Sequence, residues 1–382
     1  MGHSYWKIVT PKYISMARCN TLEIFNALRE FKVSRPFLIV DPTLKDKNLN
    51  IKKIVAEFMF KGWEIFSDFT TNPTTTQVQN AARICSNYRA DMVIAIGGGS
   101  TIDLAKAVML VSSNGGIIED YLTGKQGINN FPKFIAIPTT CGTGSETSPY
   151  AVIADCFSKK KRGIENCQFL PDLVIMDPML LLSLDKLFIA STAIDALSHI
   201  MESYVSKKAN DITRSSIRGL FVDIVSNMEN SAFSKDINAL GNMMNVAFLS
   251  RLLYPRTGLT ITHALSHPLG AYTNIHHGLA VCSFIPASLK HNYKYCKPYL
   301  DEILNLMGFV NLEQFLGWFG SFCQKTGIAV ELKKIFNNKN LPFKVIAKDA
   351  LESSNIPSNP WPVSERKLLQ VIYDSIFYWD TL

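Results

Sequence analysis

The sequence has no Cys-x-x-Cys pair, although it contains eight cysteines. They are spread singly along the chain, at positions 19, 85, 141, 156, 167, 282, 296 and 323. In a chain of 382 residues, such dispersed cysteines indicate reduced thiols rather than a disulfide framework. We therefore expect a cytoplasmic protein.

Long apolar runs are also missing. No stretch reaches the ~18–20 residues that a helix needs to cross a bilayer. The first residues, MGHSYWKIVTPKY, contain no continuous apolar core, so they do not have the pattern of a signal peptide. The sequence therefore predicts no membrane segment.

Positive charge is in excess but is not concentrated. The formal net charge is +7, and the one tight basic run, residues 159–162, is short. No basic stripe interleaved with aromatic residues and no zinc-finger spacing is present, so we expect no nucleic-acid partner. The excess instead favours small anionic ligands such as a dinucleotide.

Composition and periodicity indicate two globular domains. Apolar residues make up 47% of the chain and charged residues 19%, which is typical of a folded protein. Short β-rich runs alternate with helical stretches up to about residue 178, and helical periodicity dominates from about residue 183. We expect an α/β domain with a mainly parallel sheet at residues 1–182, and an all-α domain at residues 183–382. Breaks in the helices are expected at Pro255, Pro268 and Pro286.

Four of the seven histidines fall within fifteen residues of the second half. His263 and His267 are four residues apart, as are Asp195 and His199, and such pairs share one helix face. His277 follows beyond Pro268-Leu269-Gly270. One carboxylate with three imidazoles suits iron(II) or zinc. The alternative is a set of packed, hydrogen-bonded histidines, and we interpret His3 and His291 as surface residues.

Two glycine-rich loops follow predicted strands of the first half. GGGS at residues 97–100 follows an apolar strand and begins a helix, where backbone N–H groups can bind phosphate. CGTGSE at residues 141–146 follows a second strand. Either loop alone could be a structural turn, but two such loops together favour a nucleotide.

These motifs, taken together, resemble the iron-containing (group III) alcohol dehydrogenase family. The resemblance runs over nearly the whole chain. Its parts are Asn72-Pro73-Thr74, Gly97-Gly98-Gly99-Ser100 with Asp103 and Lys106, Pro138-Thr139-Thr140, Gly142-Thr143-Gly144-Ser145-Glu146, Asp195-x-x-x-His199, His263-x-x-x-His267-Pro-Leu-Gly and His277-Gly.

The resemblance implies a cofactor site and a preference within it. It implies that Gly97, Gly98, Gly99, Ser100, Asp103, Thr139 and Thr140 surround NAD(P), with Asn72 near the adenosine half and Lys161 beside the nicotinamide ribose. A surface charge run is the other interpretation of Lys161. Asp41 follows the first strand and would favour NAD over NADP by accepting hydrogen bonds from the ribose hydroxyls. The alternative is that Asp41 only caps a turn.

The implied chemistry is hydride transfer at a metal. Asp195, His199, His263 and His277 would bind iron(II), with zinc as the alternative, and His267 would relay a proton or contact the substrate. Of the two adjacent histidines, His277 is the expected ligand because it directly precedes Gly278. His276 should point elsewhere.

The substrate is less defined than the reaction. Tyr150 and Tyr254 fall near family pocket positions. Arg256 would favour an anionic aldehyde, such as a phosphonylated or carboxylated one, if it faces the pocket, whereas a solvated Arg256 favours a short primary alcohol. A sugar-phosphate cyclase-type lyase, a metal-dependent hydrolase and a catalytically idle binding protein are the remaining alternatives. Relatives imply a homodimer or larger homo-oligomer.

Overall fold

The computed structural model describes residues 9–125, 131–157, 161–338 and 340–382. The chain divides into two compact units, Lys7–Ser183 and Leu184–Leu382. His3, Lys159 and Lys160 lie outside the described residues.

The N-terminal unit contains a six-stranded sheet with the order β1-β8-β5-β4-β2-β3. All of its neighbouring strands pair in parallel. A separate antiparallel pair consists of β6 and β7. The strands are β1 (Tyr13–Met16), β2 (Pro36–Val40), β3 (Glu64–Phe66), β4 (Met92–Gly97), β5 (Lys133–Pro138), β6 (Tyr150–Ala154), β7 (Lys161–Glu165) and β8 (Leu173–Met176).

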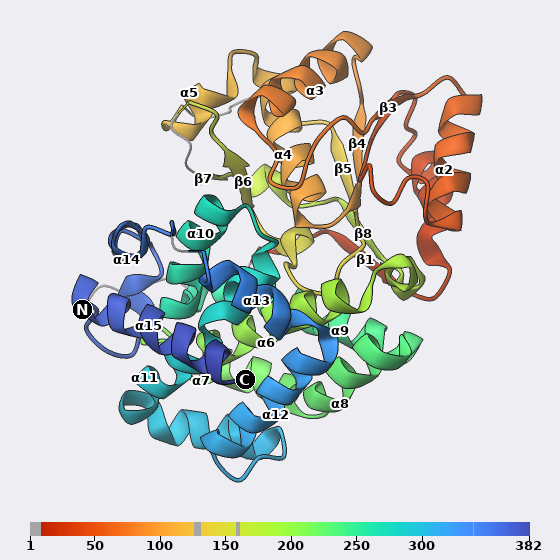
Figure 1. Cartoon of the computed structure of the whole chain (residues 1–382). Helices are drawn as coiled ribbons and strands as arrows, with labels where there is room; N and C mark the ends of the chain where they lie inside the picture. The colour runs from red at the N-terminus through yellow and green to blue at the C-terminus, as the bar shows by residue number, and fades with distance from the viewer. Residues whose placement is uncertain (1–8, 126–130, 158–160, 339) are drawn as a thin grey trace. The chain divides into compact units, whose positions relative to one another are not determined.

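The central strands are short apolar runs without alternation. β2 has the sequence PFLIV and β4 the sequence MVIAIG, and every residue of both is buried. Strands of this kind require helices over both faces of a parallel sheet. Figure 1 shows α4 running alongside β4. The helices of this unit are α1 (Ile24–Glu30), α2 (Leu49–Phe60), α3 (Thr75–Tyr88), α4 (Gly99–Asn114) and α5 (Ile118–Leu122), with short 3₁₀ turns at η1 (Asn20–Glu23), η2 (Ser145–Thr147), η3 (Cys167–Phe169) and η4 (Pro178–Ser183).

The register of β4 and β5 brings the two glycine loops together. Gly97, the last residue of β4, pairs with Pro138, the last residue of β5. The chain therefore leaves both strands at the same edge, the carboxyl ends, where parallel α/β sheets bind their ligands.

The C-terminal unit consists of helices packed around α6 (Lys186–Val205). Residues 189–205 of α6 are all buried, and α6 packs against α9 and α11. Asp185 caps its first turn by accepting a hydrogen bond from the Phe188 N–H. The other elements are α7 (Asp211–Arg218), η5 (Gly219–Phe221), α8 (Ile224–Glu229), η6 (Asn230–Ser234), α9 (Ile237–Thr257), α10 (Ile261–Thr273), α11 (His277–Leu306), α12 (Leu312–Thr326), α13 (Ile328–Phe336), α14 (Phe343–Leu351), η7 (Ile356–Ser358) and α15 (Glu365–Thr381).

The expected fold class, a mainly parallel α/β half followed by a helical half, is confirmed, whereas the expected proline breaks are wrong. Pro268 lies inside α10 and Pro286 inside α11, and α9 continues through Pro255. α10 instead ends at Asn274, which adopts a left-handed conformation with φ 54° and donates its N–H to the Gly270 carbonyl. A proline removes one helix hydrogen bond, and the packing of these buried helices offsets that loss.

No helix in the described ranges is both long and apolar enough to cross a membrane.

Candidate functional site

Asp195 lies at the centre of a cluster of three imidazoles in the C-terminal unit. The Asp195 Oδ1 atom is 3.7 Å from Nε2 of His199, one turn further along α6. It is 3.4 Å from Nε2 of His263 in α10 and 3.6 Å from Nε2 of His277 at the start of α11. Three helices therefore direct the same ring atom of three histidines towards one carboxylate oxygen.

Two polar atoms at the centre of this cluster lack hydrogen-bond partners. Asp195 Oδ1 and His263 Nε2 are buried and make no hydrogen bond within the described part of the chain. One ligand atom from each of Asp195, His263 and His277 lies within 4.8 Å of the other two. Burying one unpaired polar group in an apolar interior costs on the order of 1–3 kcal/mol of folding free energy. A cation at this point would bind these atoms, so the donor set fits a divalent metal.

Glu202 is a buried member of the site that the sequence analysis missed. Its Oε1 is 2.6 Å from Nδ1 of His263, and its Oε2 accepts hydrogen bonds from the N–H and hydroxyl of Thr260, at 2.6 and 2.7 Å. Ser198 donates to Oε1 at 2.6 Å. The contact between Glu202 Oε1 and His263 Nδ1 keeps the Nδ1 proton of His263 beside Glu202, so Nε2 is left to face Asp195.

Burial and neighbouring charges set the ionisation of these groups. Burial alone would raise the pKa of Asp195, but the charges of His199 and His277 lower it well below its ordinary value. Burial likewise opposes ionisation of Glu202, yet His263 lowers the pKa of Glu202 to about 2. Both residues are therefore carboxylates at neutral pH.

The two innermost histidines shift in opposite directions. Burial lowers the pKa of His199 to about 4, which keeps it neutral with a lone pair to offer. Burial also acts against protonation of His263, but Glu202 raises its pKa to about 9. In the metal-free protein His263 therefore holds a second proton, and a metal binding at Nε2 would displace it.

The remaining residues expected near the metal lie around the cluster. His267 is exposed, and its ring centroid is 5.5 Å from that of His277. The Tyr254 ring lies 5.0 Å from that of His199. His276 points elsewhere: its Nδ1 is 3.4 Å from the Ser191 hydroxyl. Arg256 is exposed in the last turn of α9, as a solvated helix-end arginine would be.

Gly278 allows α11 to approach α6 closely. A Cβ atom built at Gly278 would lie 2.4 Å from the Ser191 carbonyl oxygen, far inside van der Waals contact. Because His277 directly precedes it, this close approach positions the His277 imidazole relative to Asp195.

The glycine loops of the N-terminal unit form a compact turn at the start of α4. A Cβ atom at Gly98 would lie 3.0 Å from Cγ2 of Thr140, and one at Gly99 would lie 2.7 Å from Oγ1 of Thr143. No side chain caps α4 at Gly98, so its first N–H groups can serve an anion. The Thr139 hydroxyl is buried without a hydrogen-bond partner among the described residues.

Asp103 and Lys106 connect the two loops internally. Asp103 accepts hydrogen bonds from the Ser145 hydroxyl and, at 3.0 Å, from the Val152 N–H. Lys106 is fully buried and donates to the carbonyl oxygens of Ser145 and Tyr150, at 2.7 and 2.8 Å. Both carboxylate oxygens of Asp103 therefore accept hydrogen bonds from the protein itself, which gives Asp103 a role in shaping the loops.

Three of the residues expected at the cofactor come together beside α4. Lys161 donates to the Asn72 side-chain oxygen at 2.7 Å, and the Asn72 N–H donates to the Ser100 hydroxyl at 3.3 Å. Burial lowers the pKa of Lys161. Asn72 has φ 65°, a left-handed conformation that asparagine tolerates.

Asp41 closes a local turn after β2. Its Oδ1 accepts hydrogen bonds from the N–H and hydroxyl of Thr43, at 2.8 and 2.7 Å. One oxygen of Asp41, Oδ1, therefore caps a turn, as one of the two interpretations expects.

Comparison with known proteins identifies relatives along the whole length. Residues 11–178 match the iron-containing alcohol dehydrogenase model, and residues 189–376 match the C-terminal model of the Fe-containing alcohol dehydrogenase family. An aldehyde-alcohol dehydrogenase of Streptococcus pneumoniae is 30% identical over 264 residues, covering 66% of this chain and 29% of that protein. The chain thus spans less than a third of the length of that relative.

Other relatives match end to end. An NAD-dependent methanol dehydrogenase of Bacillus methanolicus is 27% identical over 369 residues, covering 93% of this chain and 95% of that protein. The crystal structure of a 1,3-propanediol oxidoreductase shares the fold with a TM-score of 0.89 at 23% identity, covering 97% of this chain and 100% of the other. The resemblance drawn from the motifs is confirmed, and this chain belongs to the iron-containing alcohol dehydrogenase family.

Proposed function

We propose that this chain is a metal-dependent, NAD(P)-linked alcohol dehydrogenase that interconverts a short primary alcohol and its aldehyde. The observation that carries the proposal is the convergence of three imidazole Nε2 atoms on Asp195 Oδ1, where Oδ1 itself and Nε2 of His263 are buried and make no hydrogen bond among the described residues. A core built only for packing would pair these atoms, because unpaired buried polar groups destabilise a fold. A bound cation accounts for all of them at once.

Asp195, His199, His263 and His277 would hold the metal, with iron(II) as the first choice and zinc as the second. When bound, such an ion supplies a Lewis acid that polarises the substrate oxygen and stabilises negative charge on it. Nitrogen and carboxylate ligands without thiolate suit either ion. The family supports iron.

The side chains around the metal ligands have separate tasks in this proposal. Glu202 keeps the proton of His263 on Nδ1, so that Nε2 faces the ion. His267, exposed beside His277, carries a proton between the substrate hydroxyl and solvent on its imidazole. Tyr254, packed beside His199, narrows the space available to the substrate.

The N-terminal unit would bind the dinucleotide at the carboxyl edge of its sheet. Gly97, Gly98, Gly99 and Ser100 present backbone N–H groups for the pyrophosphate, with Thr139 and Thr140 on the adjacent strand end. Lys161 and Asn72, already hydrogen-bonded to each other, would contact the ribose groups. Asp41 favours NAD over NADP, because a carboxylate repels a 2′-phosphate.

Arg256 decides between two substrate classes. Its exposed position at the end of α9 favours an uncharged aldehyde. The competing proposal, an anionic aldehyde such as a phosphonylated or carboxylated one, requires Arg256 to contact the substrate. For the setting of the protein, eight free cysteines in the structure support a reducing, cytoplasmic environment, and we propose a homo-oligomer by analogy with relatives.

One assay tests the proposal. Metal-free protein is loaded anaerobically with iron(II) or zinc and offered a panel of short neutral and anionic aldehydes, with NADH or NADPH, and absorbance at the nicotinamide band is followed. We expect metal-dependent oxidation of NADH by the short neutral aldehydes. NADH binding without turnover of any aldehyde under either metal would contradict the dehydrogenase assignment.

A further inference from the structure

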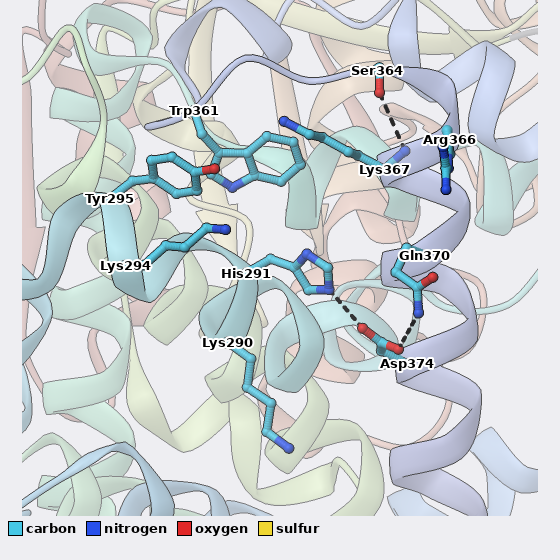
Figure 2. A pocket seen from close by; sticks show the side chains of 10 residues that line it. All are labelled: Lys290, His291, Lys294, Tyr295, Trp361, Ser364, Arg366, Lys367, Gln370 and Asp374. Atoms are coloured by element: carbon cyan, nitrogen blue, oxygen red, sulfur yellow. Dashed lines mark hydrogen bonds and ion pairs between the residues drawn. The ribbon is translucent and has the colours of Figure 1, made fainter.

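A pocket lies within the C-terminal unit, on residues that the proposed dehydrogenase site does not use. It has a volume of about 580 Å³, which is within the range of small-molecule sites. α11, α15 and the segment that precedes α15 form its walls (Figure 2). Its lining residues are Lys290, His291, Lys294, Tyr295, Trp361, Ser364, Arg366, Lys367, Gln370 and Asp374.

The pocket is strongly positive. Four cations, Lys290, Lys294, Arg366 and Lys367, line it, against the one acid Asp374. Both Asp374 oxygens are already occupied: Oδ2 is 2.7 Å from His291 Nε2, and Oδ1 accepts from the Gln370 amide at 2.8 Å. Four cations against one carboxylate leave the lining with a net positive charge, which attracts an anion entering the pocket.

The two central lysines flank an aromatic wall. Lys367 Nζ lies 4.8 Å from the centroid of the Trp361 ring, and Lys294 Nζ lies 5.0 Å from that of Tyr295. The Tyr295 and Trp361 rings are 6.0 Å apart. Figure 2 shows Lys294 and Lys367 close to Trp361, with Lys290 and Arg366 towards the edges of the group.

Trp361 is buried, and its backbone is tied to the buried Asn359. Its side chain is 2% exposed, and its Nε1–H has no hydrogen-bond partner among the described residues. The buried Asn359 fixes the segment, because its amide donates to the Trp361 carbonyl at 3.2 Å and its Oδ1 accepts from the Ile261 N–H at 3.3 Å. Trp361 therefore forms a buried floor of the pocket, and the exposed Tyr295 ring beside it is the aromatic surface that a ligand can reach.

We propose that this pocket binds a phosphate-bearing small molecule. Lysines act as point charges for phosphate, and the separated cations suit a ligand with more than one charged group. The exposed Tyr295 ring offers apolar contact to any planar part of the ligand, as a nucleobase would have. A simple monocarboxylate would use only part of this charge.

The test is calorimetric titration of pyrophosphate and of ADP into metal-loaded enzyme saturated with NADH, which fills the proposed dinucleotide site. The variant K294Q/K367Q removes the central cations, and K52Q/K53Q, two exposed lysines of α2, is the matched control. We expect the affinities of wild-type enzyme and the control for each ligand to agree within about twofold. K294Q/K367Q should bind about tenfold more weakly, because it loses charge-assisted hydrogen bonds to the phosphate.

Two further variants keep the result decisive. K290Q/R366Q removes the two outer cations of the lining, so it should weaken binding even if K294Q/K367Q proves unstable. D195N tests whether pyrophosphate acts through the metal, and we expect its binding to equal that of wild type. The proposal is overturned if wild type binds neither ligand, if K294Q/K367Q and K290Q/R366Q bind as wild type does, if the control loses as much as K294Q/K367Q, or if D195N abolishes binding.

Discussion

The two candidate sites of this chain are built from different materials. The cluster around Asp195 consists of side chains from three helices, and its Asp195 Oδ1 and His263 Nε2 atoms are buried without hydrogen bonds among the described residues. The loops after β4 and β5 consist mainly of backbone and small residues, and the nearby charged residues Asp103 and Lys106 of α4 bond to the protein itself. The first site should therefore be sensitive to the loss of side-chain atoms, and the second to their addition.

Removing a ligand from the cluster should have the largest effect. In Asp195→Asn the central carboxylate loses its charge, so we expect iron(II) affinity to fall by more than the roughly 10–100-fold typical of outer partners. Competition with a chelator measures the affinity, and aldehyde reduction should fall with it. Asp223→Asn, on an exposed residue, is the matched control. Wild-type metal affinity in Asp195→Asn would remove this region from the chemistry.

Glu202→Gln should have a smaller effect on the same region. Glutamine keeps the shape but loses the charge that holds the proton on Nδ1 of His263. We expect metal affinity to fall about 10–100-fold, while NADH affinity stays unchanged. Glu313→Gln, exposed in the first turn of α12, is the control. If Glu202→Gln binds metal as wild type does, Glu202 only supports packing.

Gly99→Ala reverses the comparison, because it adds an atom. The new Cβ would lie 2.7 Å from the Thr143 hydroxyl, so the loop has to shift. We expect NADH to bind about tenfold more weakly, the cost of modest overpacking, with metal affinity unchanged. NADH fluorescence titration measures this. Gly317→Ala, in a helix with open space around the glycine, should change neither.

The smallest expected effect is a pH dependence of folding stability that the metal cluster shows and the glycine loops do not. In the metal-free protein the folded pKa of Glu202 is about 2 against an ordinary 4.5, so its stabilisation is present above 4.5 and is lost as pH falls towards 2. The folded pKa of His263 is about 9 against 6.5, so its stabilisation is present below 6.5 and is lost as pH rises towards 9.

The pair therefore stabilises the metal-free protein most between about pH 4.5 and 6.5. We expect the difference in Tm between wild type and Glu202→Gln to be greatest in that window and to shrink on both sides. Gly99→Ala should differ from wild type by a constant amount over the same range. A flat profile for Glu202→Gln would show that the pair is not ionised as described.

Local spacing in the sequence carries much of both sites. Asp195 and His199 are predictable because residues four apart share a helix face, and the glycine loops because they follow apolar strands. Glu202 was missed, although it lies seven residues after Asp195 on the same face. Its role depends on Thr260 and His263, which reach it only through the packing of α10 on α6.

The positively charged pocket could not be predicted from sequence. Lys290 and Lys294 are one turn apart on α11, a common pattern on exposed helix faces. Trp361 and Lys367 join them only because α15 packs against α11. The proline breaks failed for a related reason: local preference favours an interruption, but tertiary contacts hold the helices through it.

The missing side chain at Gly278 limits how this protein can vary. A single methyl group there would act as a wedge against the Ser191 carbonyl, a backbone atom that no rotamer change can move aside. α11 would have to slide away from α6 and carry the neighbouring imidazole with it. Any natural or engineered replacement at this position must therefore be matched by a rearrangement of two helices, so the smallest residue in the region is the hardest to exchange.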